Sequence, residues 1–167
     1  MGTGSKTKIF CLVFAMSTMS LPQALSFRAL VESDLSQLWA IESAVYTEPW
    51  SKDLLRDSLA APMTHAVGLS ISDQICGYSI YQIVLDEGHL LNLAVDPAHQ
   101  RRGLGGQILD HSIHQVRARG VKRFFLEVRP ANEAANKLYE SRGFRGLFLR
   151  EKYYASGEHA LVMFLDV

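Results

Sequence analysis

The sequence has little of what marks several large classes of protein. Its two cysteines in 167 residues, Cys11 and Cys76, are too few for a disulfide scaffold, and they lack metal-ligand spacing. Cys76 lies in an apolar run and is expected to be a buried, structural thiol. The 17 basic residues balance 17 acidic ones, so no net charge favours nucleic acid and any anion site must be local. No apolar run approaches the roughly 20 residues that span a bilayer.

The N-terminus carries a weak targeting pattern. Two lysines precede an apolar run at residues 9–16, which resembles a short secretory signal peptide. A cleavage after Ser26 would fall inside the first predicted strand, however. The alternative, which we favour, is an upstream extension with translation starting at Met16 or Met19. We therefore expect residues 1–20 to be an N-terminal extension outside the fold and residues 21–167 to form one domain.

The rest of the chain alternates between strand and helix patterns, without repeats or a dividing linker. Strands are expected near residues 24–30, 63–70, 75–85, 89–95, 124–128, 144–152 and 159–167, with helices near 34–45, 52–59, 104–119 and 133–142. The order β-α-α-β-β-β-α-β-α-β-β predicts an α/β (α+β) domain with a mixed sheet. Ser33, Ser51 and Asn132 are expected to cap helices, and residues 72–74 to form a turn between paired strands.

The most informative stretch joins an apolar strand to an amphipathic helix. After Asn92-Leu93-Ala94-Val95-Asp96-Pro97 comes the basic glycine loop Gln100-Arg101-Arg102-Gly103-Leu104-Gly105-Gly106. Glycines allow close approach of a ligand to the backbone, and the unpaired N–H groups of a helix start attract anions. The arginine pair adds full positive charge. This combination predicts a pyrophosphate-binding loop.

The glycine loop lacks the signatures of two other phosphate-binding loops. The dinucleotide fingerprint G-x-G-x-x-G fails because residue 108 is Ile, and the G-K-[ST] of a P-loop is absent. A tight strand-to-helix turn with no ligand is the simplest alternative. The arginine pair within Gln-x-x-Gly-x-Gly favours phosphate binding over that alternative.

The glycine loop resembles the Q/R-x-x-G-x-G/A signature of GNAT acetyltransferases. Further blocks resemble the ribosomal-protein-alanine N-acetyltransferase (RimI) branch of that family, and they follow its order from about Leu25 to the C-terminus. They are Glu48-Pro49-Trp50-Ser51, Val84-Leu85-Asp86-Glu87, Asn92 to Pro97, Leu126-Glu127-Val128-Arg129, Asn132-Glu133-Ala134-Ala135, Leu138 to Phe144 and Lys152-Tyr153-Tyr154. The resemblance implies the GNAT fold, a mixed central sheet of about seven strands flanked by about four helices.

The resemblance also implies a cosubstrate, an acceptor and their site residues. Acetyl-CoA would be the cosubstrate and the N-terminal alanine of a small-subunit ribosomal protein the acceptor, in the cytoplasm. Glu127 matches the family's general base and Tyr139 its general acid. The cofactor positions are the backbone of Leu93, Ala94 and Val95 for the thioester and pantetheine, Arg101, Arg102, Gly103, Leu104, Gly105 and Gly106 for the pyrophosphate, and Asn132 for coenzyme A.

Elementary chemistry is compatible with these roles. An α-amine with a pKa of ~7.7–8.0 is about one tenth neutral at pH 7, and a lysine far less, so either acceptor benefits from a base. Without the resemblance, a single Glu on a strand such as Glu127 is more often a satisfied or exposed carboxylate than a base, and core packing is the default for Tyr139. The six histidines show no metal-ligand spacing, so no metal is assigned. No nucleophile motif occurs, which favours direct transfer in a ternary complex.

Two aromatic segments of the sequence are candidates for the acceptor site. The segments Tyr46 to Trp50 and Lys152 to Tyr154 are expected to form the walls of a peptide groove, with Asp86, Glu87 and Glu48 giving it a negative lining. No direct contact with nucleic acid or membrane is expected. The alternatives are a GNAT enzyme acting on a polyamine, a drug or lysine, and a non-catalytic acyl-CoA-binding module.

Overall fold

The computed structural model describes residues 24–167, which form one seven-stranded sheet with four α-helices. The predicted extension at residues 1–20, with Cys11, lies outside the described residues. The sheet order is β1-β2-β3-β4-β5-β7-β6, and only β4 and β5 run parallel. The strands are β1 (Leu25–Ala29), β2 (Thr64–Ile71), β3 (Gln74–Val84), β4 (Glu87–Val95), β5 (Arg123–Val128), β6 (Arg145–Arg150) and β7 (Ala160–Asp166). The predicted mixed sheet and element order are confirmed.

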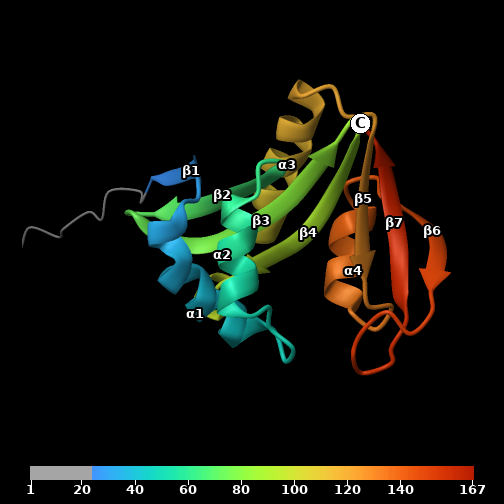
Figure 1. Cartoon of the computed structure of the whole chain (residues 1–167), viewed down its shortest axis with the longest axis horizontal. Helices are drawn as coiled ribbons and strands as arrows, with labels where there is room; N and C mark the ends of the chain where they lie inside the picture. Colours follow the sequence, from blue (N-terminus) through green and yellow to red (C-terminus); the bar gives the residue numbers. More distant parts are fainter. Residues whose placement is uncertain (1–23) are drawn as a thin grey trace, which may run out of the picture.

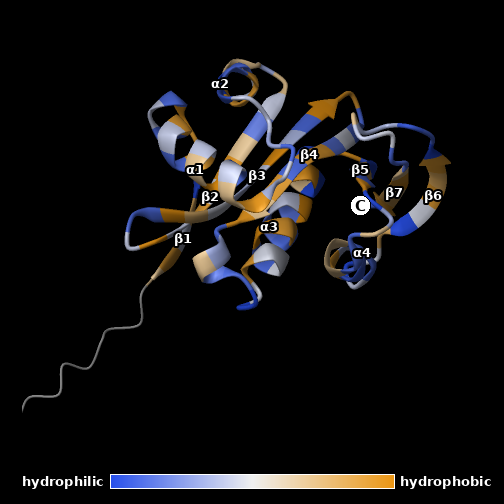
Figure 2. Cartoon of the chain, turned by 90° about the horizontal axis from the view of Figure 1, so that it is seen from below, coloured by the Kyte–Doolittle hydropathy of each residue, from blue (hydrophilic) through white to orange (hydrophobic). Residues whose placement is uncertain are grey.

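The helices cover the two faces of the sheet in pairs. They are α1 (Leu35–Val45), α2 (Lys52–Ala60), α3 (Leu104–Ala118) and α4 (Glu133–Glu140). Helices α1 and α2 lie on one face, and α3 and α4 on the other (Figures 1 and 2). The hydrophobic residues of each helix face the sheet, so two apolar layers form above and below the strands (Figure 2). Cys76 is buried between them, as predicted.

Two of the three predicted helix caps are confirmed. Ser51 Oγ accepts a hydrogen bond from Leu54 N at 3.1 Å, and Asn132 Oδ1 accepts one from Ala135 N at 3.1 Å. The cap at Ser33 is wrong, because a short 3-10 turn spans Glu32–Asp34 and α1 begins only at Leu35.

Local hydrogen bonding explains that correction and a second one. The Asp34 carboxylate binds Val31 N at 2.9 Å and Arg28 at 2.7 Å, which holds the turn ahead of α1. The hairpin between β2 and β3 is also tighter than predicted. Ser72 and Asp73 both have positive φ (49° and 67°), so they form the turn alone and Gln74 already belongs to β3.

The sheet opens between β4 and β5. These strands pair only from Glu87 and Arg123 as far as Leu90 and Leu126. At that point Leu91 is an extra residue in β4, because Ile80 faces Asn92 while Tyr81 faces Leu90. Beyond it β4 follows β3 and β5 follows β7, so the two halves of the sheet diverge (Figure 1). This divergence creates the space for a site.

Within residues 24–167, no helix is long and apolar enough to cross a membrane.

Candidate active site

A cleft of about 590 Å³ occupies the opening between β4 and β5. It brings together Glu127, Tyr139, Asn132 and Leu93, which come from two strands and one capped helix. The remaining lining residues come mainly from β4 and β5, from the loop after α1, from α4 and from the β6–β7 loop. The full set is Glu42, Tyr46, Glu48, Trp50, Leu90, Leu91, Asn92, Leu93, Leu126, Glu127, Val128, Arg129, Asn132, Ala135, Leu138, Tyr139, Tyr153, Tyr154 and Ala155.

The proposed acid and base enter the cleft from opposite faces of the sheet. Leu126 and Val128 belong to the core beneath α3 and α4, together with Tyr139. Because successive strand residues alternate between faces, Glu127 points to the α1 and α2 side. The cleft therefore passes through the sheet, with Tyr139 on one side and Glu127 on the other. Such an opening can admit two substrates from two directions.

Glu127 is held by an arginine from the edge strand. Its Oε1 lies 3.1 Å from Arg150 Nη1, and its side chain remains 22% exposed. A partly accessible carboxylate in this position can accept a proton directly or through one water molecule.

Tyr139 is 9% exposed on the inner side of α4. Burial, with a smaller contribution from Tyr154, raises the pKa of Tyr139 to about 12. Its hydroxyl therefore stays protonated throughout the neutral range, which a proton donor requires.

The glycine loop has the geometry of an anion site. Gln100 Nε2 closes the loop by donating to Val95 O at 2.9 Å, and Arg101 and Gly103 take positive φ angles of 59° and 76°. The first bond at the start of α3 is donated by Gln107 N to Gly103 O. The N–H groups of residues 104–106 precede that bond, so they are available to an anion.

The loop adjoins the cleft through α4. A Cβ atom built on Gly105 would lie 3.6 Å from Leu138 Cδ2 and 3.7 Å from Val95 Cγ2. Leu138 also lines the cleft, so helix α4, which carries Tyr139, lies between the glycine loop and the cleft. Asn132 uses its Oδ1 to cap that helix, which leaves its amide N–H groups as donors toward the cleft.

Residues from both segments that were predicted as acceptor walls line the cleft, namely Tyr46, Glu48, Trp50, Tyr153 and Tyr154. Arg129 joins them, because its guanidinium lies 2.6 Å from Glu48 and 3.0 Å from Glu158 and stacks 3.8 Å above the Tyr154 ring. Tyr46 also donates from its hydroxyl to Leu93 O at 2.6 Å.

The predicted negative lining is partly wrong. Asp86 and Glu87 lie at the closed end of the β4–β5 pair, where Asp86 O accepts from Lys122 N at 2.7 Å. They are therefore remote from the cleft, and the charge of Glu48 is matched by Arg129. The sequence analysis missed Glu42, a buried carboxylate in α1 that also lines the cleft. The sequence pattern that could have revealed it is an acidic residue one helical turn after the inward-facing Leu38.

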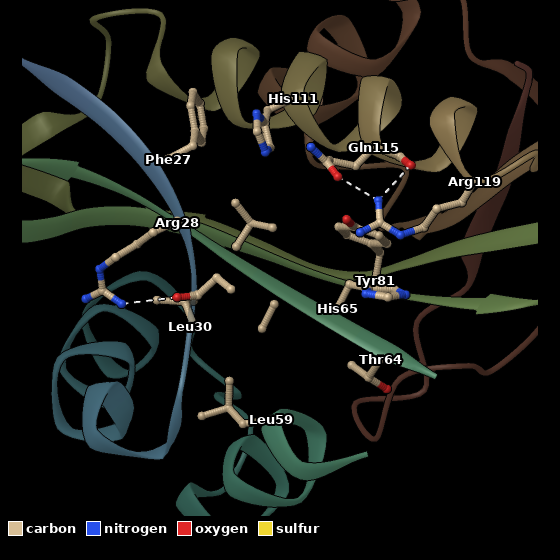
Figure 3. A pocket seen from close by; sticks show the side chains of 13 residues that line it. Phe27, Arg28, Leu30, Leu59, Thr64, His65, Tyr81, His111, Gln115 and Arg119 are labelled. Atoms are coloured by element: carbon tan, nitrogen blue, oxygen red, sulfur yellow. Dashed lines mark hydrogen bonds between the residues drawn. The ribbon is translucent and has the colours of Figure 1, made fainter. Parts of the chain in front are cut away.

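A second hollow, of about 370 Å³, lies beside β1, β2 and α3 (Figure 3). His65 and His111 line it, and burial lowers the pKa of both. No carboxylate is among the described residues that line it, and His111, Gln115 and Arg119 place it at the far end of α3 from the glycine loop. This hollow is therefore separate from the glycine loop and shares none of its described lining residues with the cleft. Across residues 24–167, no group of three His, Cys, Asp or Glu side chains is arranged to hold a metal.

Comparisons with known proteins agree with this geometry. Residues 35–144 match the acetyltransferase (GNAT) family. The ribosomal protein bS18-alanine N-acetyltransferase of Haemophilus ducreyi is 40% identical over 140 residues, which cover 81% of this chain and 96% of that protein. The crystal structure of the ribosomal-protein-S18-alanine N-acetyltransferase from Escherichia coli has a TM-score of 0.81 at 36% identity, covering 86% of this chain and 94% of that one.

A more distant structure shares the fold. The PaiA N-acetyltransferase from Thermoplasma acidophilum, solved in complex with coenzyme A, has a TM-score of 0.74 at 18% identity and covers 86% of this chain and 99% of that one. At this level of identity the likeness shows the fold alone.

These findings define the class of the protein. The chain belongs to the GNAT family and is an acetyl-CoA-dependent N-acetyltransferase. Within that family, its resemblance to the ribosomal-protein-alanine N-acetyltransferases is confirmed by relatives that match most of its length.

Proposed function

We propose that this enzyme acetylates the N-terminal alanine of ribosomal protein bS18, a small-subunit protein, in the cytoplasm. The names of its relatives support the acceptor, since the Haemophilus ducreyi protein carries that activity in its name. The groove on the α1–α2 side supports it as well. Its aromatic walls, from Tyr46, Trp50 and Tyr154, suit an extended chain end.

The cofactor would approach from the α3–α4 side. The N–H groups of residues 104–106, with Arg101 and Arg102, would hold the pyrophosphate. The backbone of Leu93, Ala94 and Val95 would hold the pantetheine and thioester, and the Asn132 amide would donate to coenzyme A. Acetyl-CoA supplies the activated acyl group, and the residues of this chain bind and orient it.

Direct transfer follows from the two faces of the cleft. Glu127 takes a proton from the α-ammonium group, directly or through a water molecule, and frees the nitrogen lone pair. The nitrogen forms a bond to the acetyl carbonyl carbon, the carbon–sulfur bond breaks, and the nitrogen releases its second proton to solvent. Tyr139 donates its hydroxyl proton to the leaving thiolate, so the products are an N-acetyl peptide and free coenzyme A. The proton on Glu127 passes to solvent, and solvent returns a proton to Tyr139.

The observation that carries this proposal is the convergence of Glu127 and Tyr139 on one cleft from opposite faces of the sheet. The test is to incubate the enzyme with acetyl-CoA and bS18 that begins with alanine, and to follow intact mass and free thiol together. One acetyl group on the α-amine and one thiol released per transfer are expected. Thiol release without a mass change on bS18 would contradict the proposed acceptor.

A further inference from the structure

Glu42 is a carboxylate buried at a costly position. It lies on the inward side of α1 among apolar residues and is only 1% exposed. An ionised carboxylate loses its hydration on burial, so it needs compensating hydrogen bonds or a cation. None of the ion pairs among the described residues includes Glu42. Asp34, the other buried acid, is paired with Arg28.

Three neutral donors from three separate segments compensate Glu42. Trp50 donates from its backbone N to Oε1 at 2.8 Å. Asn92 Nδ2 donates to Oε2 at 3.1 Å, and the Tyr78 hydroxyl donates to the same oxygen. The carboxylate therefore ties the loop after α1 to β3 and to the diverging part of β4.

This junction lies at the acceptor side of the cleft. Glu42, Trp50 and Asn92 all line the cleft, and Asn92 directly precedes Leu93. Tyr46, one turn after Glu42, makes a second connection across the same gap through its bond to Leu93 O. Two polar connections thus set the distance between the acceptor wall and β4. One is the hydrogen bond from Tyr46 to Leu93 O, and the other is the bridge from Trp50 through Glu42 to Asn92. The carboxylate of the bridge is the more deeply buried of the two connections.

We propose that Glu42 is a positioning residue that fixes the acceptor wall, residues 46–50, against β4. It acts through Trp50 and Asn92 and does not touch the reacting atoms. The inference builds on the proposed function only in assigning the acceptor to the α1–α2 side, and it holds for any amine that enters there. Loss of Glu42 should therefore weaken acceptor binding and leave acetyl-CoA binding almost unchanged.

The test compares Glu42→Ala and Glu42→Gln with the wild type in two measurements. The first is amide hydrogen exchange at Trp50, which needs no substrate. The second is KM for acetyl-CoA and for whichever acceptor the wild type uses best among an Ala-initiated peptide, an α-blocked lysine peptide and spermidine. Asp34→Asn is the matched control, because it also disturbs a buried acid but lies outside the cleft lining.

For Glu42→Ala, we expect Trp50 exchange and acceptor KM each to rise about tenfold, as a buried donor loses its acceptor. Glutamine keeps one oxygen, so Glu42→Gln should give a smaller rise in both. Acetyl-CoA KM should stay within about twofold in both variants, and Asp34→Asn should change neither measurement.

Two results would overturn the inference. One is a folded Glu42→Ala variant with wild-type Trp50 exchange and acceptor KM. The other is an equal rise in both KM values, which would mean that the whole cleft had loosened. If the alanine variant does not fold, unchanged exchange and KM in Glu42→Gln decide against the inference. A wild-type preference for spermidine would instead contradict the proposed function.

Discussion

Arg150 Nη1 lies 3.1 Å from Glu127 Oε1, so a residue at the end of the edge strand β6 holds the proposed base on β5. The strand β7 lies between these two strands in the sheet. The pair is partly open to solvent, with side-chain exposures of 47% for Arg150 and 22% for Glu127. The arginine therefore orients the carboxylate at modest energetic cost.

Replacing Arg150 with alanine should lower kcat only slightly. Solvent-exposed ion pairs contribute about 0.2–1 kcal/mol, which corresponds to a rate change of about 1.4- to 5-fold if the whole contribution is lost in the transition state. Arg145→Ala is the matched control, since Arg145 lies on the same strand but pairs with Asp166. A hundredfold loss in Arg150→Ala alone would show that the arginine has a larger role than orientation.

Replacing Glu127 with glutamine should lower kcat by about 10²–10⁴-fold, the usual contribution of a general base. Glutamine keeps the shape but cannot take the proton, so coenzyme A affinity should stay near the wild-type value in calorimetric titration. Glu133→Gln, on the exposed side of α4, is the control. Near-wild-type turnover of Glu127→Gln would remove this residue from the mechanism.

The pH profile of the rate should distinguish the loss of a proton by Tyr139 from the loss of a proton by the acceptor amine. The rate kcat/KM should rise as the α-amine loses its proton near pH ~8. Because the pKa of Tyr139 is raised to about 12, its donor form is present below that pH and is lost only as the pH rises through about 12. We expect no descending limb from this residue below pH about 11. A descending limb near pH 10 that disappears in Tyr139→Phe would contradict the raised pKa.

The glycine loop offers a steric test of the cofactor site. A Cβ at Gly105 meets Leu138 and Val95 at ordinary contact distance, so Gly105→Ala should fold and bind coenzyme A almost normally. Gly105→Val adds two further carbons at the junction of loop and cleft. These carbons would hinder the approach of the phosphates to the loop backbone, so coenzyme A affinity should fall by about 5- to 150-fold, equivalent to about 1–3 kcal/mol. Unchanged calorimetric affinity in a folded valine variant would place the cofactor elsewhere.

Much of the fold could be predicted from local pattern. Ser51 and Asn132 precede runs of helical spacing, and both cap their helices as expected. Ser33 is not a cap because Asp34 binds Arg28 and Val31 N, and these bonds hold a 3-10 turn ahead of α1. Arg28 is six residues from Asp34, and helix propensity does not reveal a contact of that kind.

The site was harder to predict than the fold. Glu127 and Tyr139 line one cleft because β4 leaves β5 at the bulge of Leu91, and no local pattern indicates where two strands diverge. Asp86 and Glu87 were misplaced for the same reason, since the open end of the β4–β5 pair could not be told from the closed one. Glu42 could have been found as an acid on the apolar side of a helix, but its partners lie on β3 and β4, far away in sequence.

The central claim is most directly tested by competition among three acceptors. An Ala-initiated peptide with the bS18 N-terminal sequence, the same peptide with a blocked α-amine and a free lysine, and spermidine would be mixed with limiting acetyl-CoA. Tandem mass spectrometry then locates each acetyl group and gives relative kcat/KM. The account predicts acetylation at the α-amine of the Ala-initiated peptide with the highest kcat/KM. Preference for the blocked peptide or for spermidine would contradict it.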